Sequence, residues 1–134
     1  MKLITRNTDY AIRSLCYISK IKVVVKVSEL VKKLGVPRSF MRKILQRLNR
    51  EKILESFKGQ GGGFKLRKPP EKIRIIDIMR IFQGRLELSE CFLKKNVCPN
   101  KGKCVLRKKL HLIEGSVLKQ LKEITIASLA QGGA

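Results

Sequence analysis

The chain has 134 residues, of which 31 are lysine or arginine and 10 are aspartate or glutamate, so its formal net charge is +21. This length allows one domain, or one domain with an appendage. A chain this basic repels itself and calls for a polyanionic partner; nucleic acid comes first, because phosphates release counterions on binding. No run of roughly 18 apolar residues indicates a membrane span, and Asp9, Arg13 and Lys20 interrupt a possible signal peptide. We therefore expect a cytoplasmic protein with no membrane partner.

The first third of the chain predicts helices around one short strand. Thr8 is a suitable N-cap for the first helix, whose apolar residues recur at helical spacing as far as Ile18. Residues 23–27 include four valines, which favour a strand. Ser28 is a suitable N-cap for a second helix, which ends at Gly35. A third helix follows directly, and two short helices joined by a glycine-containing turn predict a helix-turn-helix.

The third helix, from Pro37 to about Glu51, divides into an apolar and a basic face. Proline is tolerated at a first helical position, where its missing N–H has no partner. The apolar residues expected to face the core are Phe40, Met41, Ile44, Leu45 and Leu48. The opposite face carries Arg38, Ser39, Arg42, Lys43, Gln46 and Arg47. Such a helix suits the major groove of DNA, where arginine and lysine read guanine; a solvated basic surface is the simpler alternative.

A glycine-rich hairpin follows this helix. Residues 53–57 and 64–67 have the composition of strands, and the segment between them begins Lys58-Gly59-Gln60-Gly61. It lacks the Gly-Lys-Ser/Thr ending of a phosphate-binding loop. A hairpin directly after a recognition helix predicts the wing of a winged helix. The wing residues expected to approach the phosphate backbone or the minor groove are Lys58, Gln60, Gly61 and Lys65.

The whole pattern predicts a mainly helical α+β fold with one β hairpin. Residues 1–84 would form the winged helix-turn-helix domain, including a short helix within residues 73–82 that Gly84 stops. Residues 85–104 read as a cysteine-containing loop, and residues 105–134 as a helix and tail. The helix carries an apolar stripe at Leu106, Leu110, Ile113, Val117, Leu118 and Leu121. We expect this stripe to mediate dimerisation; a helix folded back on its own domain is the alternative.

Three of the four cysteines lie close together, at Cys91, Cys98 and Cys104. In a reducing compartment, clustered cysteines indicate metal or redox chemistry rather than disulfides. Their spacing lacks the close pair of a zinc finger and suits thiolate ligation of an iron–sulfur cluster; unliganded thiols in a loop are the alternative. The remaining Cys16 lies on an apolar helix face and is predicted to be a core residue.

Three thiolates leave such a cluster one ligand short. Asp9, Glu90 and His111 are the candidates for the fourth ligand, either from this chain or from a partner chain. For Asp9, the alternative role is a carboxylate that stabilises the start of a helix. For His111, the alternative is an ordinary position on the last helix.

These features together resemble the Rrf-two family of bacterial winged-helix transcriptional regulators, which includes the iron–sulfur regulator IscR and the nitric-oxide-sensing repressor NsrR. The resemblance covers nearly the whole chain, and its motifs are Asp9-Tyr10-Ala11, Val27-Ser28-Glu29-Leu30, Lys58 to Phe64, the three cysteines and Ile124-Thr125-Ile126. It implies a homodimer on a partly palindromic double-stranded DNA operator. It also implies base and phosphate contacts from Ser39, Phe40, Arg42 and Lys43, with Lys58 near the minor groove.

The resemblance further implies that Cys91, Cys98 and Cys104 hold a 2Fe–2S or 4Fe–4S cluster. IscR-like members add a histidine three residues after the last cysteine, where this chain has Arg107. NsrR-like members instead use an aspartate from the first helix of the other subunit, and Asp9 stands at that place. The resemblance therefore implies an NsrR-like site that responds to nitric oxide, redox state or iron supply.

The predicted function is a dimeric DNA-binding repressor whose operator binding is controlled by an iron–sulfur cluster. A zinc-stabilised or metal-free DNA-binding module without sensing is the alternative. We expect no enzymatic activity, since the chain has one histidine and no recognisable nucleophile–base set. An RNA-binding role is disfavoured because an aromatic content of 5% offers few stacking platforms.

Overall fold

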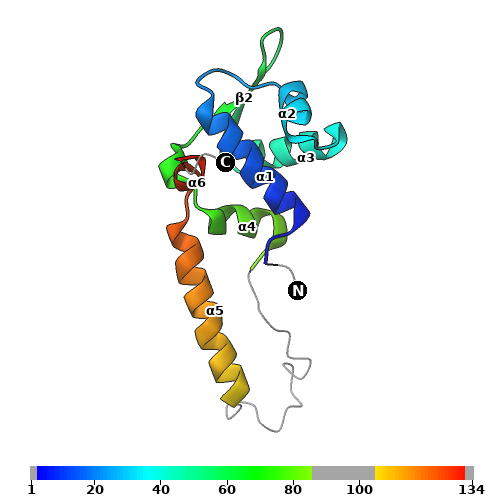
Figure 1. Ribbon diagram of the computed structural model, residues 1–134. Coiled ribbons are helices and arrows are strands. Elements are labelled where there is room, and N and C mark those ends of the chain that lie inside the picture. The colour runs from blue at the N-terminus through cyan, green and yellow to red at the C-terminus, as the bar shows by residue number, and fades with distance from the viewer. Residues whose placement is uncertain (1–2, 86–104, 132–134) are drawn as a thin grey trace.

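The computed structural model describes residues 3–85 and 105–131, which form a mostly helical structure with one antiparallel hairpin, as predicted (Figure 1). The first part contains α1 (Arg6–Lys20), α2 (Val27–Leu34), α3 (Arg38–Arg50), β1 (Leu54–Phe57) and β2 (Gly63–Leu66). The remaining elements are the 3-10 helix η1 (Pro70–Lys72), α4 (Ile75–Gln83), α5 (Val105–Glu123) and α6 (Ile126–Gln131). No described helix is both long and apolar enough to cross a bilayer.

Helix α1 lies at the centre of the hydrophobic core. Its residues Ala11, Leu15 and Ile18 are at most 1% exposed, and their spacing of three or four residues places them on one helical face. The helix contacts α2, α3, α4, α6 and β2. Each large aliphatic side chain buried here contributes roughly 1.5–3 kcal/mol relative to an exposed one. α1 is therefore the element that joins the helix-turn-helix to the C-terminal part of the chain.

Two helices begin earlier than predicted. Thr5, not Thr8, caps α1, because its hydroxyl accepts a hydrogen bond from the Thr8 N–H. Thr8 is fully buried, and its own hydroxyl donates to Gln83 Oε1 over 2.7 Å. α2 begins at Val27 after the N-cap residue Lys26, whose carbonyl accepts the first helical hydrogen bonds, so Ser28 is not the cap.

The predicted strand over residues 23–27 is reduced to a single bridge. Val25 pairs with Phe64 of β2 through two backbone hydrogen bonds of 2.8 and 2.9 Å. Val25 is fully buried, whereas Val23 is 66% exposed, so only part of the valine-rich segment packs on the hairpin. The bridge ties the segment before α2 to the base of the hairpin.

The end of the chain returns to the core through a short helix, α6, that the sequence did not predict. The Ile75 N–H donates to the Ile124 carbonyl and the Ile126 N–H donates to the Ile73 carbonyl, each over 2.9 Å. Ile126 is completely buried, and α6 packs against α1. This docking fixes the C-terminal end of α5 against the winged helix-turn-helix.

Helix α5 has two unlike halves. Near its C-terminal end, Leu121 is buried and Val117 and Leu118 pack against the core. Near its start, the apolar side chains of the stripe are largely exposed: Leu106 is 65% and Ile113 is 53% exposed. The first half extends away from the body of the molecule (Figure 1). The predicted apolar stripe is therefore covered by the chain's own core only over its last turns.

Candidate nucleic-acid interface

Helix α3 rests on the core through one face. Met41, Ile44, Leu45 and Leu48 are at most 3% exposed, and their spacing of three and four residues forms a continuous apolar stripe. Phe40, which was predicted to belong to this stripe, is 43% exposed. At about 100° per residue, Phe40 lies roughly a quarter-turn from the centre of the stripe, beside the basic face. This exposure agrees with its other predicted role, as a DNA contact.

The turn before α3 sets the direction of the helix. Gly35 ends α2 with a φ of 66°, a left-handed conformation that glycine adopts without steric cost. Its N–H donates to the Val31 carbonyl over 3.0 Å, which satisfies one carbonyl of the last turn. Pro37 then precedes the first helical residue of α3. The sequence places Gly35 correctly at the end of α2, but Pro37 is the N-cap residue of α3 rather than its first helical residue.

All residues of α3 that were predicted to contact DNA are exposed. They are Arg38, Ser39, Phe40, Arg42, Lys43, Gln46 and Arg47. The helix itself contains no acidic residue in its first turn. Arg47 forms a half-exposed ion pair of 3.5 Å with Glu51. No ion pair of Arg38, Arg42 or Lys43 is found among residues 3–85 and 105–131, so the N-terminal half of α3 presents uncompensated positive charge to solvent.

The hairpin forms the predicted wing. β1 and β2 pair antiparallel from Leu54 opposite Leu66 to Phe57 opposite Gly63. Gly61, with a φ of 75°, lies exposed at the tip. A side chain on Gly62 would collide with the Phe57 carbonyl oxygen, so the turn needs glycine there.

The predicted wing contacts are distributed over the tip and one strand. Lys58, Gln60 and Gly61 are exposed at the tip. Lys65 is exposed on β2, directly opposite Glu55 on β1. Opposite charges at facing strand positions attract each other, so Lys65 has the most compensated charge of the wing residues.

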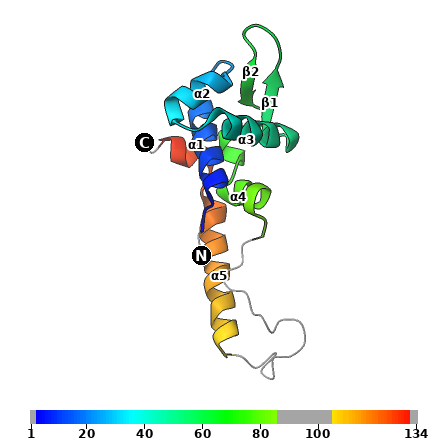
Figure 2. The same cartoon turned by 90° about the vertical axis from the view of Figure 1, so that its right-hand side faces the viewer.

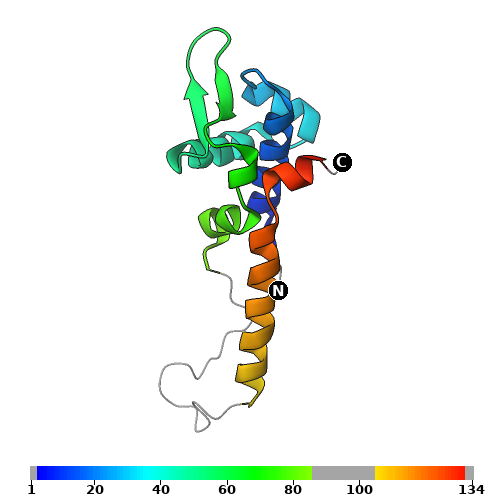
Figure 3. The same ribbon diagram turned by 90° about the vertical axis from the view of Figure 1, so that its left-hand side faces the viewer.

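The base of the wing is joined directly to the end of α3. The Ile53 N–H donates to the Leu48 carbonyl at the end of α3, and the Arg67 N–H donates to the Ile53 carbonyl. Figures 2 and 3 show α3 and the hairpin at one end of the molecule, while the start of α5 lies at the other. A rod-like polyanion can therefore meet the basic face of α3 and the wing together.

Two exposed lysines beside α3 were not among the predicted contacts. Lys32 and Lys33 lie in the last turn of α2. Both lie within three residues of Gly35, whose turn leads into α3. The signal that points to them is their position on the first helix of a helix-turn-helix, which crosses the DNA backbone in this motif.

The predicted cluster ligands Cys91, Cys98 and Cys104, with the alternative Glu90, lie outside the described residues. Among residues 3–85 and 105–131, no three His, Cys, Asp or Glu side chains gather as a metal site. His111 is exposed on α5.

Asp9 lies in the first turn of α1, where its carboxylate pairs with Arg13 over 3.0 Å and is 43% exposed. Such exposed pairs are weak.

Gln83 connects the start of α1 to the end of α4. Its Oε1 accepts hydrogen bonds from the Thr5 N–H over 3.1 Å and from the Thr8 hydroxyl over 2.7 Å. Its Nε2 donates to the Leu3 carbonyl over 2.8 Å. The first turn of α1, which carries Asp9, is therefore held beside the point where the chain leaves α4 toward residue 86.

Cys16 is a packing residue, as predicted. It is half-buried against the core. Burial raises the pKa of its thiol, and the positive charge of Lys20 offsets part of this rise. A thiol with a raised pKa is a poor metal ligand, since the thiolate is the ligating form.

Tyr17 links α1 to α2. Its hydroxyl donates a 2.8 Å hydrogen bond to the Glu29 carboxylate, which raises the pKa of Tyr17 because the bond holds the phenolic proton. The two helices are thus joined by a polar contact as well as by the core.

Known proteins resemble this chain over nearly its whole length. A model of the Rrf2 family, described as an iron-dependent transcriptional regulator, matches residues 4–132. The HTH-type transcriptional regulator NsrR of Shouchella clausii is 30% identical over 132 residues, which cover 94% of this chain and 87% of that protein. The protein aau3 of Rhizobium meliloti is 28% identical over 130 residues, covering 96% of this chain and 84% of that protein.

Solved structures share the fold. The structure of CymR (YrzC), the global cysteine regulator of B. subtilis, has a TM-score of 0.80 at 19% identity and covers 100% of both chains. The structure of T. potens IscR has a TM-score of 0.78 at 17% identity, covering 100% of this chain and 89% of that one. These likenesses confirm the predicted winged-helix fold.

Proposed function

The chain belongs to the Rrf2 family of DNA-binding transcriptional regulators, and we propose that it represses transcription by binding a partly palindromic operator as a homodimer. The predicted family is thus confirmed, as is the expectation that the protein is not an enzyme, because its relatives are transcriptional regulators. The observation that carries the proposal is the exposed basic face of α3, without acidic residues in its first turn, beside the exposed glycine-tipped wing. A repressor of this kind acts in the cytoplasm, where the operator is.

In the proposed complex, the N-terminal half of α3 lies in the major groove. Arg42 and Lys43, exposed in the middle of the helix, read base edges or hold phosphates, and Ser39 and Phe40 contact the DNA at its first turn. Gln46 and Arg47 extend the contact toward the helix end. Lys58, Gln60 and Gly61 at the wing tip approach the neighbouring minor groove, as basic residues do at its narrow, negative floor.

Two alanine substitutions test this arrangement. We expect Arg42→Ala to relax base preference and Lys58→Ala to weaken binding evenly across sequences. The measurement is affinity for a panel of duplexes that differ at one base pair, with Lys119→Ala on α5 as the control. Unchanged preference and affinity in both variants would show that another face reads the DNA.

Dimerisation is proposed to occur through the first half of α5. Its exposed apolar residues include Leu106, Leu112 and Ile113, and large exposed apolar patches mark interaction sites. A dimer places two α3 helices against half-sites one helical turn, or a multiple of it, apart. The spacing of the operator half-sites is therefore set by the α5 contact.

The donor chemistry of the chain fits an iron–sulfur cluster. Cys91, Cys98 and Cys104 supply three thiolates, and Asp9 supplies an exposed carboxylate that only a weak ion pair holds. We propose that these four residues hold the cluster, with Asp9 coming from the partner subunit. When bound, the cluster supplies a centre that reacts with nitric oxide or oxidants, or that reports iron supply.

In this proposal, a displacement of Asp9 reaches the DNA-reading surface through the contacts of α1. Asp9 lies on α1, which Gln83 ties to α4 and which packs directly against α3. A shift of the first turn of α1 therefore changes the orientation of α3 relative to the α3 helix of the other subunit. Because two half-sites must be met at once, a small rotation of one subunit lowers operator affinity.

Anaerobic purification tests the metal proposal. We expect iron and acid-labile sulfide in the protein and a visible absorption spectrum that changes in Asp9→Ala, with Asp77→Ala as the matched aspartate control. Zinc without iron would favour the zinc-stabilised module, and absence of metal would favour a metal-free DNA-binding protein. An unchanged spectrum and operator affinity in Asp9→Ala would remove Asp9 from the site.

A further inference from the structure

The exposed aromatic side chains lie on the same elements as the proposed DNA contacts. Within residues 3–85 and 105–131, the large apolar side chains that are exposed include two aromatic rings, Phe40 and Phe57. Phe40 is 43% exposed on α3 and is already a predicted contact. Phe57 is 42% exposed on β1 of the wing and has no role yet. Both exposed rings thus belong to the two elements that are proposed to meet DNA.

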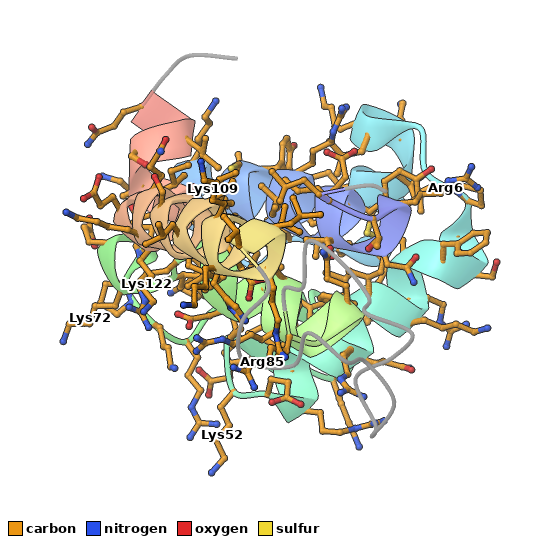
Figure 4. The ribbon with its side chains drawn as sticks, turned by 90° about the horizontal axis from the view of Figure 1, so that it is seen from below. Arg6, Lys52, Lys72, Arg85, Lys109 and Lys122 are labelled. Atoms are coloured by element: carbon orange, nitrogen blue, oxygen red, sulfur yellow. The ribbon has the colours of Figure 1, made fainter. Side chains whose placement is uncertain are left out.

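Positive charge is less selective than these rings. Figure 4 views the molecule from the end opposite the wing and shows the exposed Lys52, Lys72 and Lys122 there. Cations therefore occur on several sides of the domain, as expected for a chain with a net charge of +21. The exposed rings, by contrast, are confined to α3 and the wing among the described residues, so they distinguish this surface better than charge does.

The register of the hairpin leaves Phe57 without a cross-strand side-chain partner. Phe57 lies opposite Gly63 on β2. A side chain at Gly63 would collide with the carbonyl oxygen of Val25, so this position needs glycine. Cross-strand pairs of side chains are the usual cover of an aromatic residue in a hairpin. The backbone bridge at Val25 therefore keeps the partner position empty, and the Phe57 ring stays exposed.

The neighbours of Phe57 on its face of the hairpin are polar. Side chains alternate between the two faces of a strand, so Phe57 shares a face with Glu55 and lies on the opposite face from the buried Leu54. Lys65 is the cross-strand partner of Glu55, and Lys58 follows Phe57 directly at the tip. The cores of protein–protein interfaces are depleted of charged residues, so a single ring among charged side chains does not favour a protein partner.

We propose that Phe57 is an apolar DNA contact of the wing, with its ring packed against deoxyribose and base edges of the minor groove; this inference rests on the proposed DNA binding. The tip at Lys58, Gln60 and Gly61 is proposed to approach that groove, and Phe57 precedes Lys58 by one position, about 3.3 Å of strand. Proteins that enter the minor groove combine basic residues with apolar side chains that pack at the base steps. Phe57 and Lys58 together supply this combination.

An apolar contact differs from an ionic one in its response to salt. A lysine that neutralises a phosphate releases counterions, so the contribution of Lys58 to affinity falls as the salt concentration rises. The Phe57 ring neutralises no phosphate, and its contribution comes from apolar surface removed from water. The affinity that the ring provides should therefore persist at high salt.

The test measures binding of the full-length protein to a fluorescein-labelled duplex selected from a random pool, by fluorescence anisotropy over a range of salt concentrations. We expect Phe57→Thr to weaken binding about tenfold at every salt concentration, because the apolar contact is lost, and to keep the parental slope of log affinity against log salt. Lys58→Ala should instead make that slope shallower by about 0.9. Phe57→Leu keeps an apolar side chain and should keep most of the affinity.

Two controls separate a DNA contact from a structural role of the ring. Leu129→Thr removes an apolar side chain that is 39% exposed on α6, outside the proposed DNA surface, and should leave affinity unchanged. Threonine has a high strand propensity, so the hairpin amides of Phe57→Thr should keep their parental protection from hydrogen exchange.

Different results would overturn different parts of the proposal. Parental affinity in Phe57→Thr, together with a loss in Lys58→Ala, would remove the ring from the DNA contact and leave the wing in it. Parental binding in Phe57→Thr, Lys58→Ala and Arg42→Ala alike would mean that the proposed DNA surface itself is wrong.

The controls have contrary outcomes of their own. A loss of affinity with lost protection of the hairpin would mean that the ring stabilises the wing by covering Gly63 and does not contact DNA. An equal loss in Leu129→Thr would mean that the effect is not specific to the wing. A weaker dimer with unchanged DNA affinity in Phe57→Thr, measured by sedimentation equilibrium, would assign the ring to a protein contact.

Discussion

Helix α3 and the first half of α5 both carry apolar side chains, but only the apolar face of α3 is buried within its own chain. The apolar face of α3 is at most 3% exposed at Met41, Ile44, Leu45 and Leu48. On α5, Leu106 and Leu112 remain 65% and 74% exposed. The surface proposed to read DNA therefore needs only one chain, whereas the surface proposed for dimerisation needs a second copy to cover it. The proposed DNA contact and the proposed dimer contact thus lie on different helices of this molecule.

The largest expected difference between the two regions is in stability. Leu45→Ala removes a fully buried side chain and is expected to lower the free energy of unfolding by about 2–5 kcal/mol. Leu112→Ala removes an exposed one and is expected to change it by less than about 0.5 kcal/mol at concentrations where the protein is monomeric. Urea denaturation measures both. Similar losses for the two leucines would mean that α5 is covered within one chain.

A second substitution addresses association alone. Leu106→Asp with Ile113→Asp places charges on the exposed stripe and is expected to weaken the dimer at least tenfold, because burying an unpaired charge is costly. Sedimentation equilibrium gives the dissociation constant, and Lys108→Ala serves as the surface control. An unchanged constant would remove this half of α5 from the dimer contact.

A smaller effect is expected at the junction of α1 and α4. Gln83→Ala removes the Gln83 acceptor of the buried Thr8 hydroxyl, which keeps the Thr5 hydroxyl as a partner, and is expected to cost about 0.5–1.5 kcal/mol. The substitution should also loosen the first turn of α1 at Asp9, which hydrogen exchange of the α1 amides can measure. Gln120→Ala on exposed α5 is the control. Native-like protection in Gln83→Ala would mean that the Gln83 contacts do not hold this turn.

The smallest effect is expected at the surface pair of Asp9 and Arg13. Arg13→Ala removes a mostly exposed ion pair and is expected to cost less than about 1 kcal/mol, with the loss fading at high salt. Thermal melts at two ionic strengths measure it. A larger, salt-independent loss would mean that Asp9 depends on Arg13 for its position.

The parts of the molecule that local signals define were predictable. The Gly35 turn, the amphipathic α3 and the glycine-tipped hairpin are set by neighbouring residues, and the structure has all three. The Phe40 error came from a position at the edge of the helical stripe, where periodicity alone does not decide burial.

The parts that depend on distant contacts were not predictable. The Thr8–Gln83 hydrogen bond joins residues 75 positions apart. Because of this bond, Thr8 is buried, and Thr5 is the N-cap residue of α1. Likewise, α6 is positioned by two backbone hydrogen bonds, in which the Ile75 N–H donates to the Ile124 carbonyl and the Ile126 N–H donates to the Ile73 carbonyl, and no local pattern encodes that pairing.

The most direct test of the DNA-reading surface is the salt dependence of affinity for a duplex selected from a random pool. The variant Arg38→Ala, Arg42→Ala, Lys43→Ala is compared with Lys119→Ala, Lys122→Ala by fluorescence anisotropy. We predict that the α3 variant binds at least a hundredfold more weakly, and that its slope of log affinity against log salt is shallower by about 0.9 for each phosphate that the variant no longer neutralises. The α5 variant should keep nearly the parental affinity and slope. Equal losses of affinity in the two variants, or an unchanged slope in the α3 variant, would contradict the assignment of α3 and the wing as the surface that meets DNA.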